Sequence, residues 1–505
     1  MAVDKDTTPN ERSPENKTNR KELLPILLGV VPYLWTNWWT LLGTIISGVS
    51  GCIIIFSLAF ELVNPVSKIY LTAVIFIVMP AFFVLGLIII PLGLWWERKH
   101  KRAAYPNPIQ AAFQFALADK KTRRTILFVG VITAANFFII GAAGQQAFHL
   151  MDSPAFCGKL CHQVMTPEYT AYLRSPHSRV ACVQCHIGPG ASWAVKSKIA
   201  GLRQVAAVLG NTFHRPIPTP VKELRPARDT CEQCHWPAKF HGNRIAFFTH
   251  YQDDEKNTPL VNGLVLKVGG ENPTSKEFEG IHWHVSPEVE LRYEALDDAR
   301  EKIGKITVKK KGQVTAEYTL PGQPKGPVVE QRLMDCVDCH NRPSHVFDQN
   351  PAQALDRAFD EGRLDPKIPF LHKVASQLLG RNDLPRESAE SFFRQGLIDT
   401  FHKDYPQISL DEKTIQAVAS VLTDLYTRNI YPDLKIAWGS YPSHLGHRGE
   451  EQDKRGCFRC HDDEHVTKTG QPLAKDCDLC HEAIVEGEAR DKLPSALRSV
   501  FSVKP

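Results

Sequence analysis

The chain has 505 residues, enough for three or four modules, and its hydrophobic and charged fractions of 43% and 23% are those of an ordinary folded protein. The formal net charge is only +5, and the positive side chains gather beside apolar runs, which argues against nucleic acid as a partner. Twelve of the 13 cysteines fall in six motifs that each end in a histidine, which argues against a disulfide framework.

The first 150 residues are predicted to form a membrane domain. Residues 1–20 are polar and predict a disordered cytoplasmic tail, whereas residues 21–35 are apolar but too short to span a bilayer, which favours an interfacial helix. Three longer runs contain no Asp, Glu, Lys or Arg, and at about 1.5 Å per residue each is long enough to cross a membrane. Buried core helices are the alternative, but three such runs favour transmembrane helices at 38–60, 69–96 and 125–150.

Basic residues set the orientation of these helices in the membrane. They are frequent in the tail and between the second and third runs, whereas the loop between the first two runs holds only Lys68. The tail and the longer loop are therefore expected on the cytoplasmic side, and everything after residue 150 on the outer side. No histidine lies inside the spans, since His100 and His149 are both at their edges, so no b-type haem pair is expected to carry electrons across the bilayer.

The region after residue 150 carries the Cys-x-x-Cys-His signal of c-type haem attachment. Five copies are strict, and the first, CGKLCH, has one extra residue between its cysteines. A zinc site would group four ligands, but here each cysteine pair has its own histidine, so we predict six c-type haems. The predicted thioether residues are Cys157, Cys161, Cys182, Cys185, Cys231, Cys234, Cys336, Cys339, Cys457, Cys460, Cys477 and Cys480. The predicted proximal iron ligands are His162, His186, His235, His340, His461 and His481.

Composition divides the outer part into further stretches. Residues 151–350 hold the first four motifs, interrupted at about 255–330 by β-branched segments with KKGQ as a hairpin turn. Residues 351–430 lack cysteine and have helical apolar spacing, and residues 431–505 hold the last two motifs. We predict a mainly α, membrane-anchored protein with three transmembrane helices and a loop-rich periplasmic multihaem c domain that contains a small β insertion.

Histidines outside the motifs are abundant after residue 150, which favours two histidine ligands for most of the irons. Such coordination leaves no open position and suits electron transfer better than small-molecule chemistry. Met165 follows His162 by three residues and is a candidate for the same iron, with a packed core methionine as the alternative. The order of pairing cannot be read from the sequence. The candidate distal ligands are Met165, His177, His214, His282, His284, His345, His444, His447 and His465.

The first motif begins seven residues after Leu150, so its haem is expected at the membrane surface, within reach of a lipid-soluble donor. Oxidation of a quinol requires a group that accepts protons as the electrons leave. A residue that only faces lipid headgroups is the alternative in each case. The candidates for a quinol site are His149, Asp152, Lys198 and Gln204.

Residues 123–345 resemble the NapC/NirT/NrfH family of membrane-anchored tetrahaem quinol dehydrogenases. The resemblance is carried by a basic pair before a single span, by FCGKLCHQVM directly after it, by CVQCHIGPG with Lys198 twelve residues beyond its histidine, and by CVDCHNRPSH. It implies oxidation of menaquinol or ubiquinol at the periplasmic face, ligation of the first haem by Met165 and a quinol site that includes Lys198. Gln204 and Val205 stand where the family has an acid.

The larger layout is similar to that of ImcH-type inner-membrane cytochromes, with two spans in front, a β insertion and two added motifs. We therefore predict a hexahaem cytochrome c of the bacterial inner membrane that oxidises quinol at the periplasmic face. Its expected partners are the lipid bilayer, the membrane quinol pool and periplasmic c-type cytochromes or a conduit to extracellular acceptors.

Two alternatives remain open. A terminal reductase of the nitrite or hydroxylamine type needs one five-coordinate haem, which the many histidines and the lack of a Cys-x-x-Cys-Lys motif disfavour. A passive subunit of a larger respiratory complex would take its electrons from a protein instead of a quinol.

Overall fold

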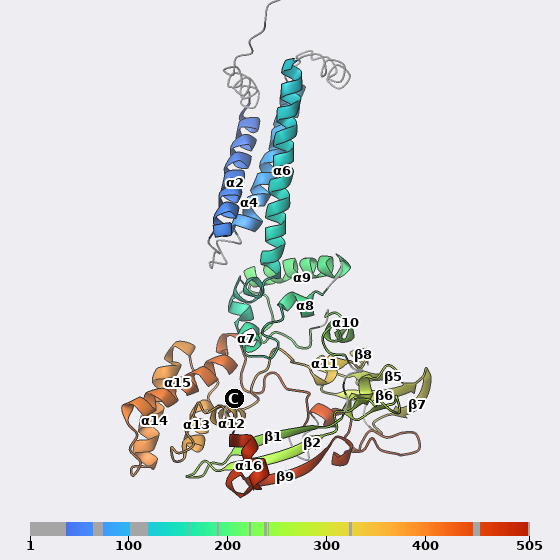
Figure 1. Ribbon diagram of the computed structural model, residues 1–505, viewed down its shortest axis with the longest axis vertical. Coiled ribbons are helices and arrows are strands. Elements are labelled where there is room, and N and C mark those ends of the chain that lie inside the picture. The colour runs from blue at the N-terminus through green and yellow to red at the C-terminus, as the bar shows by residue number, and fades with distance from the viewer. Residues whose placement is uncertain are drawn as a thin grey trace, which may run out of the picture. The chain divides into compact units, whose positions relative to one another are not determined.

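The structure is a computed structural model of the chain (Figure 1). It describes residues 37–502 except for 64–73, 101–119, 161, 189–190, 222–223, 237–239, 241, 323–325 and 448–454. The predicted tail at 1–20 and the predicted interfacial helix at 21–35 lie outside this part. The chain forms two compact units, Met1–Asp152 and Ser153–Pro505.

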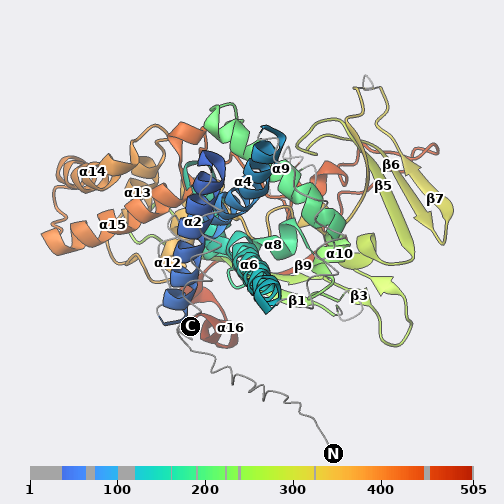
Figure 2. The ribbon, with the colours of Figure 1, turned by 90° about the horizontal axis from the view of Figure 1, so that it is seen from above.

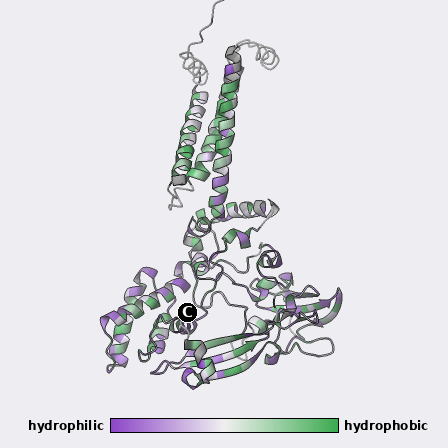
Figure 3. Ribbon diagram, in the orientation of Figure 1, coloured by the Kyte–Doolittle hydropathy of each residue, from purple (hydrophilic) through white to green (hydrophobic). Residues whose placement is uncertain are grey.

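The first unit consists of long apolar helices, and it confirms the three predicted transmembrane helices. They are α2 (Trp38–Val63), α4 (Met79–His100) with the π-helical turn η2 (Val74–Val78) directly before it, and α6 (Lys120–Asp152). Each contains a stretch long and apolar enough to cross a membrane, and Figure 3 shows that apolar residues predominate along these helices. The π turn precedes Pro80, whose nitrogen has no hydrogen to donate to the helical ladder.

Glycines allow α2 and α4 to pack closely. A Cβ added at Gly86 would lie 2.6 Å from the backbone nitrogen of Ser47, and one at Gly43 would lie 2.8 Å from the carbonyl oxygen of Gly86. The Nδ2 of Asn37 donates to the carbonyl of Gly93 at 3.1 Å. In lipid, small residues and interhelical hydrogen bonds of this kind take the place of the hydrophobic effect in holding helices together.

The second unit contains two antiparallel sheets and a two-stranded ladder. One sheet has the order β1-β2-β9 and the other the order β7-β6-β5-β8, while β3 pairs with β4. The predicted KKGQ turn joins β6 to β7: Lys311 and Gly312 have φ values of 51° and 81°, as a two-residue hairpin loop requires. The bounds are β1 (Arg244–Tyr251), β2 (Pro259–Leu266), β3 (Gly270–Glu271), β4 (Phe278–Glu279), β5 (Val289–Ala295), β6 (Ile303–Lys310), β7 (Gln313–Tyr318), β8 (Glu330–Leu333) and β9 (His481–Ala489).

These sheets confirm the predicted β insertion and extend beyond it. Strand β1 begins at Arg244, before the predicted stretch, and β9 comes from the C-terminal region that was expected to be loops. Strand β9 pairs antiparallel with β2, for example Glu488 with Val261. The sequence HEAIVEGEA contains few strongly apolar residues, so its pattern did not predict a strand.

Helices and sheets lie at opposite ends of this unit. In Figures 1 and 2, α13 to α15 lie on one side and the sheet that contains β5, β6 and β7 lies on the other. The helices are α7 (His162–Leu173), α8 (Cys182–His186), α9 (Ala191–Leu209), α10 (Ala227–Cys231), α11 (Cys336–Cys339), α12 (Pro351–Asp360), α13 (Leu371–Leu379), α14 (Ala389–Asp404), α15 (Glu412–Asn429) and α16 (Ser495–Ser502). Single turns are η3 (Phe156–Leu160), η5 (Ile281–Val285), η6 (Arg386–Ser388), η7 (Pro432–Leu434), η8 (Gly456–Arg459), η9 (Cys477–Leu479) and η10 (Arg490–Lys492).

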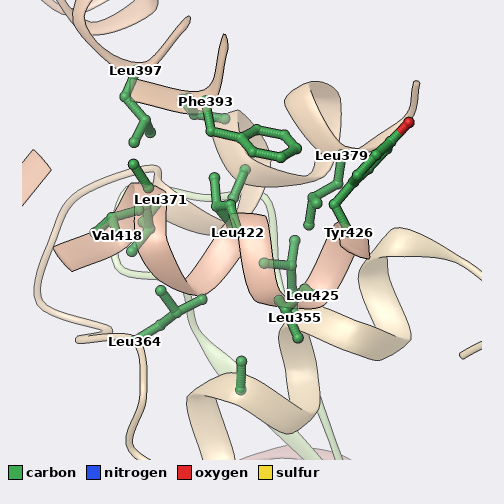
Figure 4. Packing of buried hydrophobic residues seen from close by; sticks show 14 of the residues in the cluster. Leu355, Leu364, Leu371, Leu379, Phe393, Leu397, Val418, Leu422, Leu425 and Tyr426 are labelled. Atoms are coloured by element: carbon green, nitrogen blue, oxygen red, sulfur yellow. The ribbon is translucent and has the colours of Figure 1, made fainter. Parts of the chain in front are cut away.

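Helices α12 to α15 form a conventional hydrophobic core (Figure 4). Leu355, Leu371, Leu422 and Tyr426 are fully buried within it, and Tyr426 donates its hydroxyl hydrogen to the carbonyl of Leu384 at 3.0 Å. Side-chain caps start two of these helices, since Asn350 accepts from Gln353 N and Asp411 accepts from Thr414 N, each at 2.8 Å.

Asp356 on α12 connects this helical core to the end of β1. Its carboxylate accepts from the backbone N–H of Tyr251 at 2.8 Å and lies 3.1 Å from Nδ1 of His250 and 3.5 Å from Nε2 of His372. The hydrogen bond to Asp356 raises the pKa of His250. Burial would lower the pKa of His372, but the nearby carboxylates of Asp356 and Asp253 outweigh burial, so this pKa is raised too.

We expect Asp356→Asn to destabilise the helical core more at about pH 5.5 than at about pH 8.5. A histidine whose pKa is raised by folding contributes stability below its unfolded pKa of about 6.5, and this contribution is lost as the pH rises through the folded value. Burial would raise the pKa of Asp356, but the hydrogen bonds from His250 and from the Tyr251 backbone and the nearby His372 lower it, so the carboxylate stays charged at both pH values.

Hydrogen exchange of the α12 and α13 amides in the intact protein measures this loss, expected on the order of 1–3 kcal/mol at the lower pH. Asp399→Asn, at an exposed position of α14, is the matched control. An equal loss of protection at both pH values would contradict the prediction.

Candidate haem sites

The attachment motifs form short helical turns that bring their cysteines to one side. Helix α8 spans the second motif, α11 covers both cysteines of the fourth, and η8 and η9 contain the start of the fifth and sixth. Residues three apart lie on the same face of a helix, as two bonds to one porphyrin edge require. In three motifs the backbone N–H of the histidine donates to the backbone carbonyl of the first cysteine. The bonds are His235 to Cys231 at 2.8 Å, His340 to Cys336 at 2.9 Å and His461 to Cys457 at 3.1 Å.

The first motif has a different local structure, and this explains how its extra residue is accommodated. Residues Phe156–Leu160 form a π-helical turn, which closes its hydrogen bond over one more residue than an α-helix does. A Cβ at Gly158 would collide with the ring of Tyr169, so glycine is needed at this turn. Cys161 and the side chain of His162 lie outside the described part of the chain.

Four motif histidines face a histidine from elsewhere in the chain. An imidazole nitrogen binds a metal ion at about 2 Å, so two axial imidazoles on one iron have ring centroids roughly 6 Å apart. The observed pairs fit this spacing: His186 with His345 at 6.2 Å, His235 with His177 at 6.0 Å, His461 with His284 at 6.0 Å and His481 with His447 at 5.9 Å. In the fourth motif, His340 interacts electrostatically with both His282 and His235.

Backbone carbonyls fix the orientation of these imidazoles. When Nδ1 is hydrogen-bonded to a carbonyl, the proton is held there and the neutral Nε2 is available to a metal. Burial lowers the pKa of His186, His284 and His345, which favours this neutral form. The Nδ1 contacts are His177 to Pro343 O at 3.2 Å, His282 to Val268 O at 3.1 Å, His284 to Ile281 O at 2.8 Å, His345 to Glu168 O at 3.0 Å and His461 to Ala474 O at 3.0 Å.

Other candidate distal ligands have different surroundings. His444 places Nδ1 3.2 Å from the carbonyl of Asp338 and Nε2 2.7 Å from the carboxylate of Glu301. Both nitrogens of His465 also contact protein oxygens, at Asp462 and Gly304. His214 is exposed, and Met165 is half-buried on α7. The structure therefore brings His177, His282, His284, His345 and His447 to motif histidines, and it engages both ring nitrogens of His444 and His465 elsewhere.

The candidate quinol-site residues lie on two helices of different units. His149 and Asp152 are exposed at the C-terminal end of α6, and Gln204 is exposed on α9. Lys198 is also on α9, but its side chain lies outside the described part. Their role as a quinol site stays a prediction.

The cysteines of successive motifs lie next to one another, which no pattern in the sequence indicated. The sulfurs of Cys157 and Cys182 are within hydrogen-bonding reach, as are those of Cys231 and Cys336. At the remaining junctions the cysteines interact electrostatically, Cys185 with Cys234, Cys339 with Cys457, and Cys480 with Cys457. Each motif therefore adjoins the next in chain order from the first to the sixth.

A buried polar network connects the fourth and fifth motifs. The carboxylate of Asp338, inside the fourth motif, accepts from the hydroxyl of Tyr293 and from Nε of Arg332, both at 2.6 Å. Arg459, inside the fifth motif, donates to the carbonyls of Asp338 and Arg300, also at 2.6 Å. A buried charge is costly unless it is paired and hydrogen-bonded, so this network holds the two motifs in one fixed arrangement.

Comparison with known proteins agrees with these motifs. Residues 118–217 match the N-terminal region of the NapC/NirT cytochrome c family. The chain is 39% identical over 468 residues to the cytochrome c-type protein ImcH of Geobacter sulfurreducens, which covers 92% of this chain and 90% of that protein. None of the solved structures matches the chain. The chain therefore belongs to the NapC/NirT cytochrome c family in its ImcH-like form, a membrane-anchored multihaem electron-transfer protein whose cofactor is c-type haem.

Proposed function

We propose that this protein is a quinol:cytochrome c oxidoreductase of the bacterial inner membrane, with six c-type haems on the periplasmic side. The observation that carries the proposal is the set of four histidine pairs with ring centroids about 6 Å apart, together with interactions between cysteines of successive motifs from the first to the sixth. The first motif begins five residues after α6 ends at Asp152. One end of the row of six haem sites, which we call the carrier line, is therefore tethered to a transmembrane helix. A c-type haem supplies a one-electron iron couple when bound.

The histidine pairs support electron transfer rather than a terminal reductase. A reductase needs an iron with an open position, whereas five of the six motif histidines have a second histidine beside them. The side chain of His162, in the first motif, lies outside the described part of the chain, and Met165 is half-buried on the same helix, α7.

A groove in the membrane unit supports a lipid-soluble donor. It has a volume of about 700 Å³ and lies between the C-terminal halves of α2 and α6. With the N-terminus in the cytoplasm, both helices run outward, so the groove would lie in the outer half of the bilayer. Its walls are apolar, as the prenyl tail of a quinol requires. The lining residues are Ile55, Leu58, Ala59, Ala135, Phe138, Ile139, Ala142 and Gln146.

Helix α6 runs from this groove directly to the candidate proton acceptors. Gln146 lines the groove, His149 follows it by three residues on the same side of the helix, and Asp152 is the last residue of the helix. The overall reaction takes two electrons and two protons from one quinol, gives the electrons to two one-electron acceptors and releases the protons outside. Asp152 or His149 would accept the protons in turn.

The test uses the purified protein in lipid nanodiscs without oxygen. We expect a reduced menaquinone analogue with a prenyl tail to reduce the haems, as followed by the visible absorption band of ferrous haem. Haems that stay oxidised with this quinol but are reduced by dithionite would contradict the proposal. Ala142→Leu should narrow the groove and raise the KM for the prenylated quinol more than for a tail-free analogue, whereas Ala134→Leu makes the same substitution at an exposed position of α6 outside the groove and serves as the control.

A further inference from the structure

The last motif presents one of its two attachment residues to solvent. Of the eleven motif cysteines within the described part of the chain, Cys234 and Cys477 are the exposed ones. Cys480, the other cysteine of the sixth motif, interacts electrostatically with Cys457 of the fifth. The sixth motif therefore has an inner side toward the preceding motif and an outer side at Cys477. A porphyrin bonded there would bring one edge to the surface of the protein.

The surface around Cys477 is strongly acidic. Residues 475–489 contain five acidic side chains, all exposed, and a single basic side chain, Lys475. The ammonium group of Lys475 lies over the ring of Phe458, 4.3 Å from its centroid. Lys267 from the neighbouring loop forms an ion pair with Glu482 at 2.7 Å. The five carboxylates belong to Asp476, Asp478, Glu482, Glu486 and Glu488.

Apolar side chains are exposed among these carboxylates. Leu479 is 51% exposed and Ile484 is 44% exposed. An apolar patch with a charged rim is the usual composition of a transient protein interface, because the apolar centre contributes affinity and the rim steers the partner. We name residues 476–488 the acidic exit face.

Protection of an edge strand is the simpler explanation for some of these charges. Strand β9 is at the edge of its sheet, and charged residues discourage pairing of such an edge with another chain. This accounts for Glu486 and Glu488. It does not account for Asp476 and Asp478, which precede the strand and flank the exposed cysteine, or for the exposure of Leu479.

The other exposed attachment residue has different neighbours. Cys234 is followed closely by Trp236, which is 59% exposed, and the short helix before it carries Arg228. Carboxylates also occur near the third motif, at Asp229 and Glu232, but Arg228 lies among them, whereas residues 476–488 contain five carboxylates and no lysine or arginine. The sixth motif is also the one farthest in sequence from the membrane helix.

We propose that the acidic exit face is the docking surface for a small soluble cytochrome c whose own haem edge is surrounded by lysines. The inference rests on the proposed function only in requiring that electrons leave the protein at its sixth motif. In each encounter the reduced protein loses one electron and the ferric partner gains it, and no bond or proton is exchanged. Opposite charges on the two faces raise the rate of productive encounters.

The test measures the exit step alone and uses no quinol. The full chain in nanodiscs is reduced with dithionite, freed of excess reductant and mixed in a stopped-flow instrument with an oxidised lysine-rich monohaem cytochrome c. The variant Asp476→Asn/Asp478→Asn/Glu486→Gln/Glu488→Gln removes four charges. We expect its second-order rate constant at low ionic strength to be about tenfold lower than that of the unaltered protein, and the two constants to converge at high salt.

The control Glu387→Gln/Asp399→Asn/Asp404→Asn/Asp433→Asn removes four exposed carboxylates elsewhere in the second unit and should leave the rate unchanged. Acetylation of the partner's lysines should abolish the difference between the two variants. Equal rates for the unaltered protein and the acidic-face variant, or an equal loss in the control, would overturn the proposal. Because the protein is reduced chemically, a failure here is distinguishable from a failure of quinol oxidation.

Discussion

Cys336→Ala/Cys339→Ala is expected to abolish electron transfer from quinol to an external cytochrome c while quinol still reduces part of the protein. The fourth motif adjoins the third through Cys231 and the fifth through Cys457. Removing the haem of the fourth motif leaves a gap in the middle of the carrier line. Because electron-tunnelling rates fall exponentially with distance, transfer across this gap should be very slow. We expect the quinol-driven rate to fall below detection.

Three measurements check this prediction. Mass spectrometry should find the variant lighter by one haem with the remaining attachments retained, which shows that the rest of the protein has matured. Visible spectra should show rapid partial reduction by quinol, and the external cytochrome should stay oxidised. Cys52→Ala is the control, because Cys52 lies on α2 outside every motif. Transfer at an unchanged rate through the five-haem variant would show that the contacts do not form the route.

His345→Met should raise the midpoint potential of one haem by on the order of a hundred millivolts, within the span of about 0.8 V that axial ligands cover. The ring of His345 lies 6.2 Å from that of His186, with its Nδ1 held by Glu168 O at 3.0 Å. A methionine sulfur is a weaker donor to ferric iron than an imidazole, so the ferrous form gains relative stability.

A redox titration followed by electron paramagnetic resonance resolves the individual haems and measures this shift. His214→Met is the matched control, because His214 is exposed and its replacement should leave every potential unchanged. If the titration of the His345 variant superimposes on that of the unaltered protein, His345 is not an axial ligand.

Local patterns were sufficient for the membrane helices, the attachment motifs and part of the sheet structure. A transmembrane run is recognised by length and lack of charge, both properties of contiguous residues. The predicted spans at 38–60, 69–96 and 125–150 correspond to α2, to η2 with α4, and to α6. The KKGQ hairpin was predictable for the same reason, since the turn at Lys311 and Gly312 depends on two adjacent residues.

Strand β9 and the order of the motifs depend on contacts that no local pattern encodes. Glu488 pairs with Val261 from more than two hundred residues earlier, and the weakly apolar sequence of β9 becomes a strand only because β2 offers it an edge. The junction of Cys231 with Cys336 spans the whole β insertion in the same way. Long-range pairing is decided by the packing of the complete unit.

The candidate distal histidines show most clearly what the sequence and the tertiary structure each determine. The sequence alone placed His444, His447 and His465 near the fifth motif and treated them alike. In the folded chain His447 faces His481, whereas both ring nitrogens of His444 and of His465 contact protein oxygens. The sequence by itself determined that this region contains haem-attachment motifs and candidate histidine ligands, because each attachment motif consists of five or six adjacent residues. The tertiary structure decided which imidazole faces which motif, because that depends on the position and hydrogen-bond partners of rings that come from distant parts of the chain.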